Sequence, residues 1–381
     1  MAIGYGFLST HPPTMCGLAT FNSALATHLA THGTPSGIVR VTEAGDDQRP
    51  GPGVVQTWRA TTTAGWRDAV AALNAYDVAV VQHEYGIYPG KDGEDVLPLL
   101  RRLTTPSIVV LHTVLSNPTA EQKSLLEQIV AAADAVVTMT DTAHDRLLLG
   151  YRVDARKVSV IPHGATDRPA QTPAPARQPG SHLLTWGLLG PGKGVEWVLR
   201  ALTELRDLDP APTYTVAGRT HPKVVARDGE AYRTQLNQLG ARLGVAHMVN
   251  YRSGYQDPAE LDRLIRSADV VVLPYDSREQ VTSGVLTEAV AAGIPVVATA
   301  FPHAVEVLAD GPGLLVPQGD PVALAGAVRR LLTEPGLSAR LTTRTGPLTA
   351  DVRWPAVAAR YDELAGRLIR AEATSADAAT T

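Results

Sequence analysis

Short runs of apolar, mostly β-branched residues alternate with longer stretches of helical periodicity along almost the whole chain. In the first half such runs occupy residues 77–82, 107–111, 135–139 and 157–161, and each predicts a β-strand. The runs are continuously apolar rather than alternating, as expected for strands covered on both faces of a sheet. This alternation predicts a parallel sheet with helices on both sides.

The same rhythm resumes in the second half of the chain. A final helix is expected at 321–332. Predicted strands precede it at 182–187, 213–217, 247–250, 270–273 and 295–299.

Residues 167–181 (DRPAQTPAPARQPGS) separate the two halves and are rich in proline and alanine, so they suit neither a helix nor a central strand. A chain of 381 residues is too long for one ordinary core and suits two domains of about 150 to 200 residues. We therefore predict an N-terminal Rossmann-like α/β domain at 1–166, a linker at 167–181 and a second Rossmann-like α/β domain at 182–350.

A C-terminal helix is predicted over 351–372, where Val357, Tyr361, Leu364 and Leu368 follow helical spacing. Such an apolar face has to be covered, and we expect this helix to pack back on the N-terminal domain. Residues 373–381 are small and polar and are expected to form a flexible tail.

Composition excludes several classes of protein. Hydrophobic residues make up 44% and charged residues 19%, which is the balance of a folded globular chain. A formal net charge of -4 supplies no basic field for holding nucleic acid. Without a signal peptide or an apolar run of roughly 20 residues, the protein is expected to have no integral membrane segment and to be cytoplasmic. Cys16 is the single cysteine, and no Cys/His cluster has zinc-ligand spacing, so no metal is expected.

Two Rossmann-like domains that face each other create a cleft. Ligands of open α/β sheets bind beyond the carboxyl ends of the strands. Functional residues are therefore expected in the loops that follow predicted strands.

The most informative loop lies within residues 270–293, VVVLPYDSREQVTSGVLTEAVAAG. A buried strand ends there at Pro274, and Ser283-Gly284 opens a helix whose N-terminus suits a diphosphate. Glu288 lies about one turn inside that helix, where a carboxylate can accept ribose hydroxyls. An ordinary strand, loop and solvated glutamate explain this segment equally well when it is taken alone.

A second loop, residues 185–194 (TWGLLGPGKG), also joins a strand to a helix. Its glycines at 187, 190, 192 and 194 leave backbone N–H groups open, and Lys193 adds a point charge for a phosphate. The spacing is not that of a P-loop. The alternative is an ordinary glycine-rich turn, and the position of this loop about ninety residues before Ser283 favours a shared site.

Together these motifs resemble glycosyltransferase family 4, whose members are retaining, nucleotide-sugar-dependent enzymes with the GT-B fold. Residues 187–194 resemble that family's glycine turn, and residues 270–293 its E-x7-E donor signature. Four more segments follow in the same order over about 300 residues, namely 15–18 (MCGL), 111–113 (LHT), 161–164 (IPHG) and 317–320 (PQGD).

The resemblance implies a role for each matching residue. His112, Lys193 and Gln280 are its catalytic residues, with His112 facing the transferred sugar from the other domain. His83, Glu84 and Tyr85 are candidates for contact with the sugar or the acceptor, with a plain hydrogen-bonded turn as the alternative. The implied donor-binding residues are Gly17, Gly187, Gly192, Arg219, Val281, Thr282, Ser283, Gly284, Val285 and Glu288.

Two residues depart from the family's pattern. Gln280 stands where the family has the first glutamate of E-x7-E, so sugar recognition is expected to be altered rather than lost. Leu188 stands where many members have an arginine, and Arg219 in the next loop is the candidate replacement.

The resemblance therefore predicts transfer of a hexose-type sugar from a nucleotide-sugar donor to an acceptor hydroxyl or other nucleophile, with retention and without a metal or cofactor. The acceptor is expected to be a small soluble molecule or saccharide. Asp207-Leu208-Asp209, the one Asp-x-Asp triplet, ends a helical stretch and is interpreted as solvated. Alternatives are an epimerase or phosphorylase on the same fold, or a nucleotide-sugar-binding protein with little catalysis.

Overall fold

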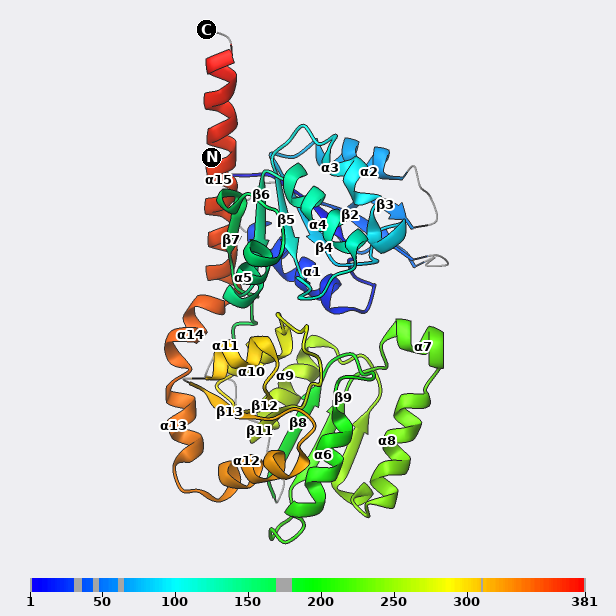
Figure 1. The fold of residues 1–381 in the computed structure, drawn as a ribbon, viewed down its shortest axis with the longest axis vertical. Coiled ribbons are helices and arrows are strands. Elements are labelled where there is room, and N and C mark those ends of the chain that lie inside the picture. The colour runs from blue at the N-terminus through cyan, green and yellow to red at the C-terminus, as the bar shows by residue number, and fades with distance from the viewer. Residues whose placement is uncertain are drawn as a thin grey trace. The chain divides into compact units, whose positions relative to one another are not determined.

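The computed structural model describes residues 2–30, 36–43, 48–60, 65–168, 180–309 and 311–379. The chain divides into two compact units, a first unit of Met1–Gly164 with Trp354–Thr381 and a second unit of Ala165–Arg353 (Figure 1). Residues 169–179 of the predicted linker lie outside the described residues.

Among its described residues, the first unit contains a seven-stranded parallel sheet in the order β3-β2-β1-β4-β5-β6-β7. Strands β1, β2, β4, β5 and β6 are buried along their whole length, as expected for strands covered on both faces, although β2 includes the buried Arg40. The strands are β1 (Tyr5–Ser9), β2 (Gly37–Thr42), β3 (Val54–Arg59), β4 (Val78–His83), β5 (Ser107–Leu111), β6 (Ala135–Thr138) and β7 (Val158–Val160).

Helices α1 and α15 pack on one face of this sheet, where Phe7 and Val80 from the strands meet Phe21 and Tyr361 from the helices. Side chains alternate between the faces of a strand, so the neighbouring strand residues belong to the opposite face. The helices of this unit are α1 (Gly17–Leu29), α2 (Trp66–Leu73), α3 (Val96–Leu100), α4 (Ala120–Ala132), α5 (Asp141–Gly150) and α15 (Trp354–Ala379).

Helix α15 differs from the predicted C-terminal helix at both ends. It begins at Trp354 rather than 351, and residues 373–379, predicted as a flexible tail, continue it. Its first residue packs closely on Gly164, where a Cβ atom would lie 2.2 Å from the Trp354 ring. Glycine is therefore required where the first unit's N-terminal part ends.

The second unit has, within residues 180–309 and 311–353, a six-stranded parallel sheet in the order β10-β9-β8-β11-β12-β13. The strand predicted at 247–250 begins two residues later, because residues 246–248 form a short 3-10 turn. The strands are β8 (His182–Trp186), β9 (Thr213–Ala217), β10 (Val249–Arg252), β11 (Val270–Leu273), β12 (Val296–Thr299) and β13 (Gly313–Val316).

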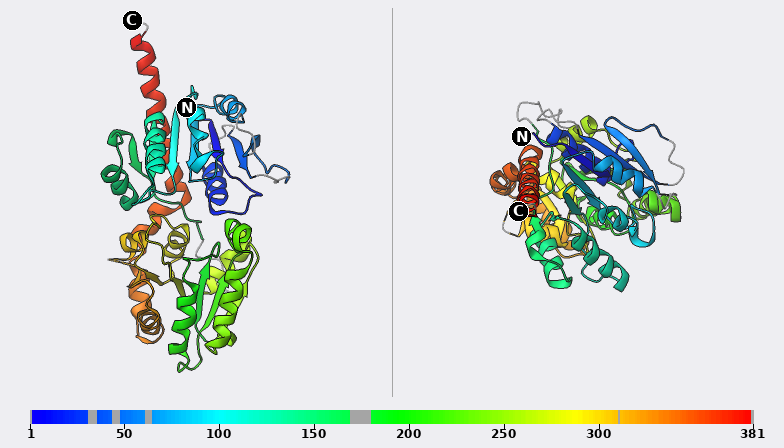
Figure 2. Two further views of the ribbon diagram at one scale, coloured as in Figure 1. Left: turned by 45° about the vertical axis from the view of Figure 1, so that its right-hand side comes forward. Right: turned by 90° about the horizontal axis from the view of Figure 1, so that it is seen from above.

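Helices cover both faces of this second sheet (Figure 2). One face packs against α6 (Val195–Ala201), α8 (Ala231–Arg242), α12 (Pro321–Thr333) and α13 (Leu337–Thr343). The other packs against α9 (Pro258–Ser267), α10 (Gly284–Ala291) and α11 (Pro302–Leu308). The unit also contains α7 (Pro222–Asp228) and α14 (Gly346–Val352).

Several helices begin where a polar side chain accepts a hydrogen bond from the free N–H groups of the first turn. Thr119 forms a full capping box with Gln122 at the start of α4. Ser283 caps α10, and Asp320 in the predicted 317–320 loop caps α12. These local signals explain why helix starts were predictable from the sequence.

The strand order reverses between β1 and β4 in the first unit and between β8 and β11 in the second. Such switch points open the carboxyl edge of a sheet to ligands. Two parallel-sheet α/β units confirm the predicted Rossmann-like architecture. No helix in the described part of the chain has the length and hydropathy needed to span a membrane.

Candidate active site

The two predicted donor loops meet at the β8/β11 switch point of the second unit. The Asp276 N–H donates to the Gly192 carbonyl over 3.0 Å. Gly194 has a φ of 66°, and a Cβ atom there would lie 1.7 Å from the Pro274 carbonyl oxygen. Only glycine fits this contact, so the turn around Lys193 and the loop after β11 form one surface.

Lys193 extends from that turn over the face of Tyr275, with its Nζ 4.2 Å from the ring centroid. No carboxylate among the described residues pairs with this ammonium group. Burial lowers the pKa of Lys193 from 10.5 to about 8. A desolvated cation that meets only a ring face is well suited to an anionic ligand.

The N-terminus of α10 lies beside the same glycine turn, since a Cβ atom at Gly187 would lie 3.6 Å from the Val285 side chain. The Ser283 hydroxyl accepts the Leu286 N–H over 3.2 Å. The N–H groups of Gly284 and Val285 have no hydrogen-bond partner in the part of the chain that the structure describes. Two free N–H donors at a helix N-terminus can hold a phosphate.

His303 on α11 supports this helix start and was missed in the sequence. Its Nδ1 accepts the Ser283 N–H over 2.8 Å, and its side chain is buried. The His303 N–H in turn donates to the Gln280 carbonyl over 3.3 Å. Its position at the start of α11, four residues after the end of β12, was the one available signal.

Gln280 turns its amide inward, because Nε2 donates to the Thr282 carbonyl within the same loop. Val281, Thr282 and Ser283 are buried. The predicted contact between Gln280 and a sugar therefore remains a prediction, and it requires this amide to leave or share its present partner.

Two further side chains hold the loop after β11. Trp197 donates its indole N–H to both carboxylate oxygens of Asp276, each over 2.8 Å. Gln318, from the predicted 317–320 loop, donates to the carbonyls of Tyr275 and Ser277 over 3.2 and 3.3 Å. These contacts keep Tyr275 under Lys193.

Arg219 lies alongside the glycine turn. Its carbonyl accepts the Leu189 N–H over 2.9 Å, and the His221 N–H donates to the Leu189 carbonyl over 2.8 Å. This short ladder places Arg219 next to the segment that contains Leu188, as its role as a replacement cation requires.

Glu288 is engaged by the segment that follows Gly164. Its Oε1 accepts the N–H and hydroxyl of Thr166, each over 3.0 Å. Its Oε2 lies 2.6 Å from a guanidinium nitrogen of Arg168. Thr166 and Arg168 were not among the predicted site residues, since the proline-rich composition that follows them suggested only a linker.

In the first unit, His112 follows β5 and donates through Nε2 to the Gln82 amide oxygen over 2.8 Å. Its ring meets the edge of Phe21 at 4.9 Å between centroids. Burial and the neighbouring histidines lower its pKa to about 3. His112 is therefore neutral at physiological pH, with Nδ1 left as an acceptor.

His83 is the last residue of β4 rather than a loop residue, and it is only 1% exposed. Burial lowers its pKa to about 4. Glu84 accepts the Tyr85 N–H over 2.8 Å and the Thr113 hydroxyl over 2.6 Å. This is the hydrogen-bonded turn that the sequence left as the alternative, so substrate contact by these residues stays a prediction.

Gly17 begins α1 after the first strand, and a Cβ atom there would meet nothing within 4 Å. Cys16 caps this helix through its Sγ, which accepts the Ala19 N–H over 3.4 Å. Cys16 therefore has a structural role at the helix start.

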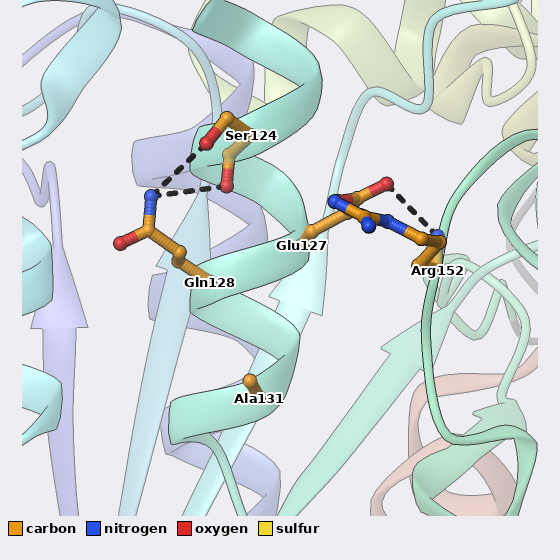
Figure 3. A pocket seen from close by; sticks show the side chains of 5 residues that line it. All are labelled: Ser124, Glu127, Gln128, Ala131 and Arg152. Carbon is orange, nitrogen blue, oxygen red and sulfur yellow. Dashed lines mark hydrogen bonds and ion pairs between the residues drawn. The ribbon is translucent and has the colours of Figure 1, made fainter.

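A shallow hollow on the first unit lies elsewhere, along α4 (Figure 3). Gln128 bonds back to Ser124, and Glu127 pairs with Arg152. The residues that line this hollow include none of the predicted site residues.

Among the described residues, no group of three or more His, Cys, Asp or Glu side chains is placed to hold a metal ion.

The fold defines the class of protein. HepE of Anabaena, solved in complex with UDP and glucose, has a TM-score of 0.74 and 16% identity and covers 96% of this chain and 100% of its own. At that identity the likeness concerns the fold alone. It agrees with the two Rossmann-like α/β units described above, the GT-B fold of glycosyltransferases.

Sequence comparison identifies the family. Residues 180–334 match the family profile "Glycosyl transferases group 1". The D-inositol 3-phosphate glycosyltransferase of Frankia alni is 30% identical over 327 residues, 76% of this chain and 78% of that protein. That of Stackebrandtia nassauensis is 33% identical over 254 residues, 63% of this chain and about half (55%) of its own length. The chain belongs to the glycosyl transferases group 1 family, and the predicted resemblance to a GT-B glycosyltransferase is confirmed.

Proposed function

We propose that this protein transfers a hexose-type sugar from a nucleotide diphosphate sugar to an acceptor hydroxyl or other nucleophile, with retention and without a metal ion. The family relatives are named as glycosyltransferases, and the solved structure of HepE contains UDP and glucose. Both support a nucleotide-sugar donor here.

The proposal rests on one observation, namely that Lys193 and the N-terminus of α10 lie at the same switch point. Lys193 brings an uncompensated charge to the β8/β11 switch point, and Gly284 and Val285 offer free N–H donors there. Charge develops on the diphosphate as the bond to the sugar breaks. Fixed N–H donors and a desolvated ammonium group can stabilise that charge, a role that a bound metal ion has in metal-dependent transferases.

The remaining proposed roles are those that the family resemblance implies. Arg219 supplies a second cation beside the glycine turn, Glu288 binds the ribose, and Gln280 binds the sugar. His112 is neutral, so its contribution is a hydrogen bond rather than a charge. Attack by the acceptor on the face of the departing phosphate accounts for retention without a nucleophilic carboxylate.

The acceptor is proposed to be a small polar molecule or saccharide. Two relatives are named for D-inositol 3-phosphate, and a polyol of that kind is the first acceptor to test. The cytoplasmic location expected from the sequence remains a prediction.

Thermal unfolding with UDP-, GDP-, ADP- and TDP-sugars, each with and without EDTA, tests the donor site. A ligand that binds only the folded state raises the melting temperature. A shift from one nucleotide that survives EDTA supports the proposal, and no shift from any of them contradicts the donor site around Lys193. NMR of the product then reports whether the anomeric configuration is retained.

Product analysis with the donor that gives the shift separates the alternatives. A binding protein gives the shift without turnover. An epimerase changes the sugar while it stays on the nucleotide, and a phosphorylase requires inorganic phosphate.

A further inference from the structure

Glu288, the proposed ribose ligand, has both carboxylate oxygens already engaged. Thr166 donates two hydrogen bonds to Oε1, from its N–H and from its hydroxyl. Oε2 lies 2.6 Å from an Arg168 nitrogen as an ion pair, accepts no hydrogen bond from the described residues and is buried from solvent. Each carboxylate oxygen offers about two acceptor positions. Both positions on Oε1 are taken and Oε2 is buried, so a ribose hydroxyl finds no open position on Glu288.

The two partners of Glu288 are held with very different strength. The Arg168 side chain is only 9% exposed and also pairs with Asp262 over 2.8 Å. Asp262 pairs in addition with Arg266 over 2.7 Å. Removing a nearly buried guanidinium from two carboxylates leaves charges uncompensated and is costly.

Thr166 is exposed, and its hydroxyl donates a hydrogen bond to Glu288. Because this donor is uncharged and open to solvent, water can replace the hydrogen bond. The Thr166 hydroxyl is therefore the partner that a ligand can displace from Oε1.

We propose that Thr166 is a positioning residue that occupies the ribose-binding oxygen of Glu288 until the nucleotide displaces it, while Arg168 holds the carboxylate in place. This rests on the proposed function. Thr166 is the second residue of the second unit, two positions after Gly164. Nucleotide binding thereby acts on the segment of chain that joins the two units.

Substitution Thr166→Val tests the proposal, because it removes the hydroxyl and keeps the N–H. It frees one acceptor position on Oε1. The affinity for UDP, GDP or ADP, measured by calorimetry, is expected to rise roughly tenfold, as one hydrogen bond to a charged group is removed from the competition. The 2′,3′-dideoxy form of the same nucleotide should change by less than about twofold, because it has no ribose hydroxyl for Glu288.

Two variants are matched controls. Thr166→Ser retains the competing hydroxyl and should behave like the wild type. Thr333→Val removes another exposed threonine hydroxyl of the second unit, one that bonds only the Arg329 carbonyl, and should leave both affinities unchanged.

Arg168→Gln provides the opposite test, with weaker binding of the ribonucleotide and unchanged binding of the dideoxy form. If that variant fails to fold, the Thr166 variants decide alone.

The outcomes distinguish this inference from the proposed function. A gain in Thr166→Val confined to the ribonucleotide supports it. An equal gain for the dideoxy form, or no gain, overturns it and leaves the donor site intact. If the wild type binds none of the three nucleoside diphosphates, the donor site itself is wrong and this inference falls with it.

Discussion

The ammonium group of Lys193 lies 4.2 Å from the centre of the Tyr275 ring. Two loops about eighty residues apart in the sequence thus form one surface at the β8/β11 switch point. The backbone carbonyl of Tyr275 accepts hydrogen bonds from the Gln318 amide and from the Thr299 hydroxyl, the latter over 2.6 Å. The position of the cation is consequently set by loops that follow three different strands.

Replacement of Lys193 by methionine should weaken nucleoside diphosphate binding by roughly 10- to 100-fold, since a hydrogen bond between charged groups is lost. The melting temperature should stay the same or rise, because a half-buried charge without a carboxylate partner is removed. Lys223→Met, at an exposed position of the same unit, is the control. Equal binding by the two variants would exclude Lys193 from the donor site.

Donor binding and protein stability should respond to alkaline pH in opposite directions. The pKa of Lys193 falls from 10.5 in the unfolded chain to about 8 in the folded one, so the unfolded state binds more protons between these values. Its contribution to the free energy of unfolding therefore rises from pH 8 to 10.5. Diphosphate affinity, which needs the charged form, should be constant below about pH 8 and fall above it. Urea unfolding measures the first effect and titration calorimetry the second, each for the wild type and Lys193→Met, and an identical pH dependence in the two proteins would contradict this assignment.

Gly194→Ala should destabilise the protein much more than Gly336→Ala. The two glycines share the left-handed conformation, with φ angles of 66° and 74°, so both substitutions carry the left-handed penalty of about 1–2 kcal/mol. A Cβ atom at Gly194 also collides with the Pro274 carbonyl, whereas one at Gly336 would meet only the end of the Arg340 side chain, 3.4 Å away. Urea unfolding of both variants gives the difference, and equal losses would mean that the contact with Pro274 is not tight.

His303→Phe should lower stability by about 1–3 kcal/mol, the cost of leaving the buried Ser283 N–H without an acceptor. The start of α10 should also loosen and weaken diphosphate binding. His247→Phe, at an exposed position, serves as the control in the same urea titration. The prediction fails if both histidine variants are equally stable and bind equally well.

His112 should leave no ionisation in the pH–rate profile between pH 5 and 7, because burial and the nearby histidines lower its pKa to about 3. Its substitution by glutamine should reduce the rate by a similar factor at every pH in that interval. An acidic limb near pH 6.5 that disappears in His112→Gln would show instead that this histidine works as a proton carrier.

Local signals account for the parts of the site that were predictable. β-branched runs located β5, β9 and β11 at their observed bounds, and the Ser283 cap located the start of α10. The spacing of the glycines identified the turn around Lys193, because the positive φ angles at Gly187, Gly192 and Gly194 favour glycine. Each of these features depends on a few neighbouring residues.

Contacts between distant segments were beyond the sequence pattern. Arg168 reaches Glu288, and His303 reaches Ser283. The burial of His83 likewise depends on helices that cover β4 rather than on its neighbours in the chain.

The sequence alone therefore determined the α/β class, the order of elements and the two loops at the β8/β11 switch point, because strand, turn and capping preferences act over a few residues. The tertiary structure alone decided which distant side chains contact one another. Partners such as Thr166 and Glu288 are 122 residues apart and meet only after strand order and helix packing bring their backbones together.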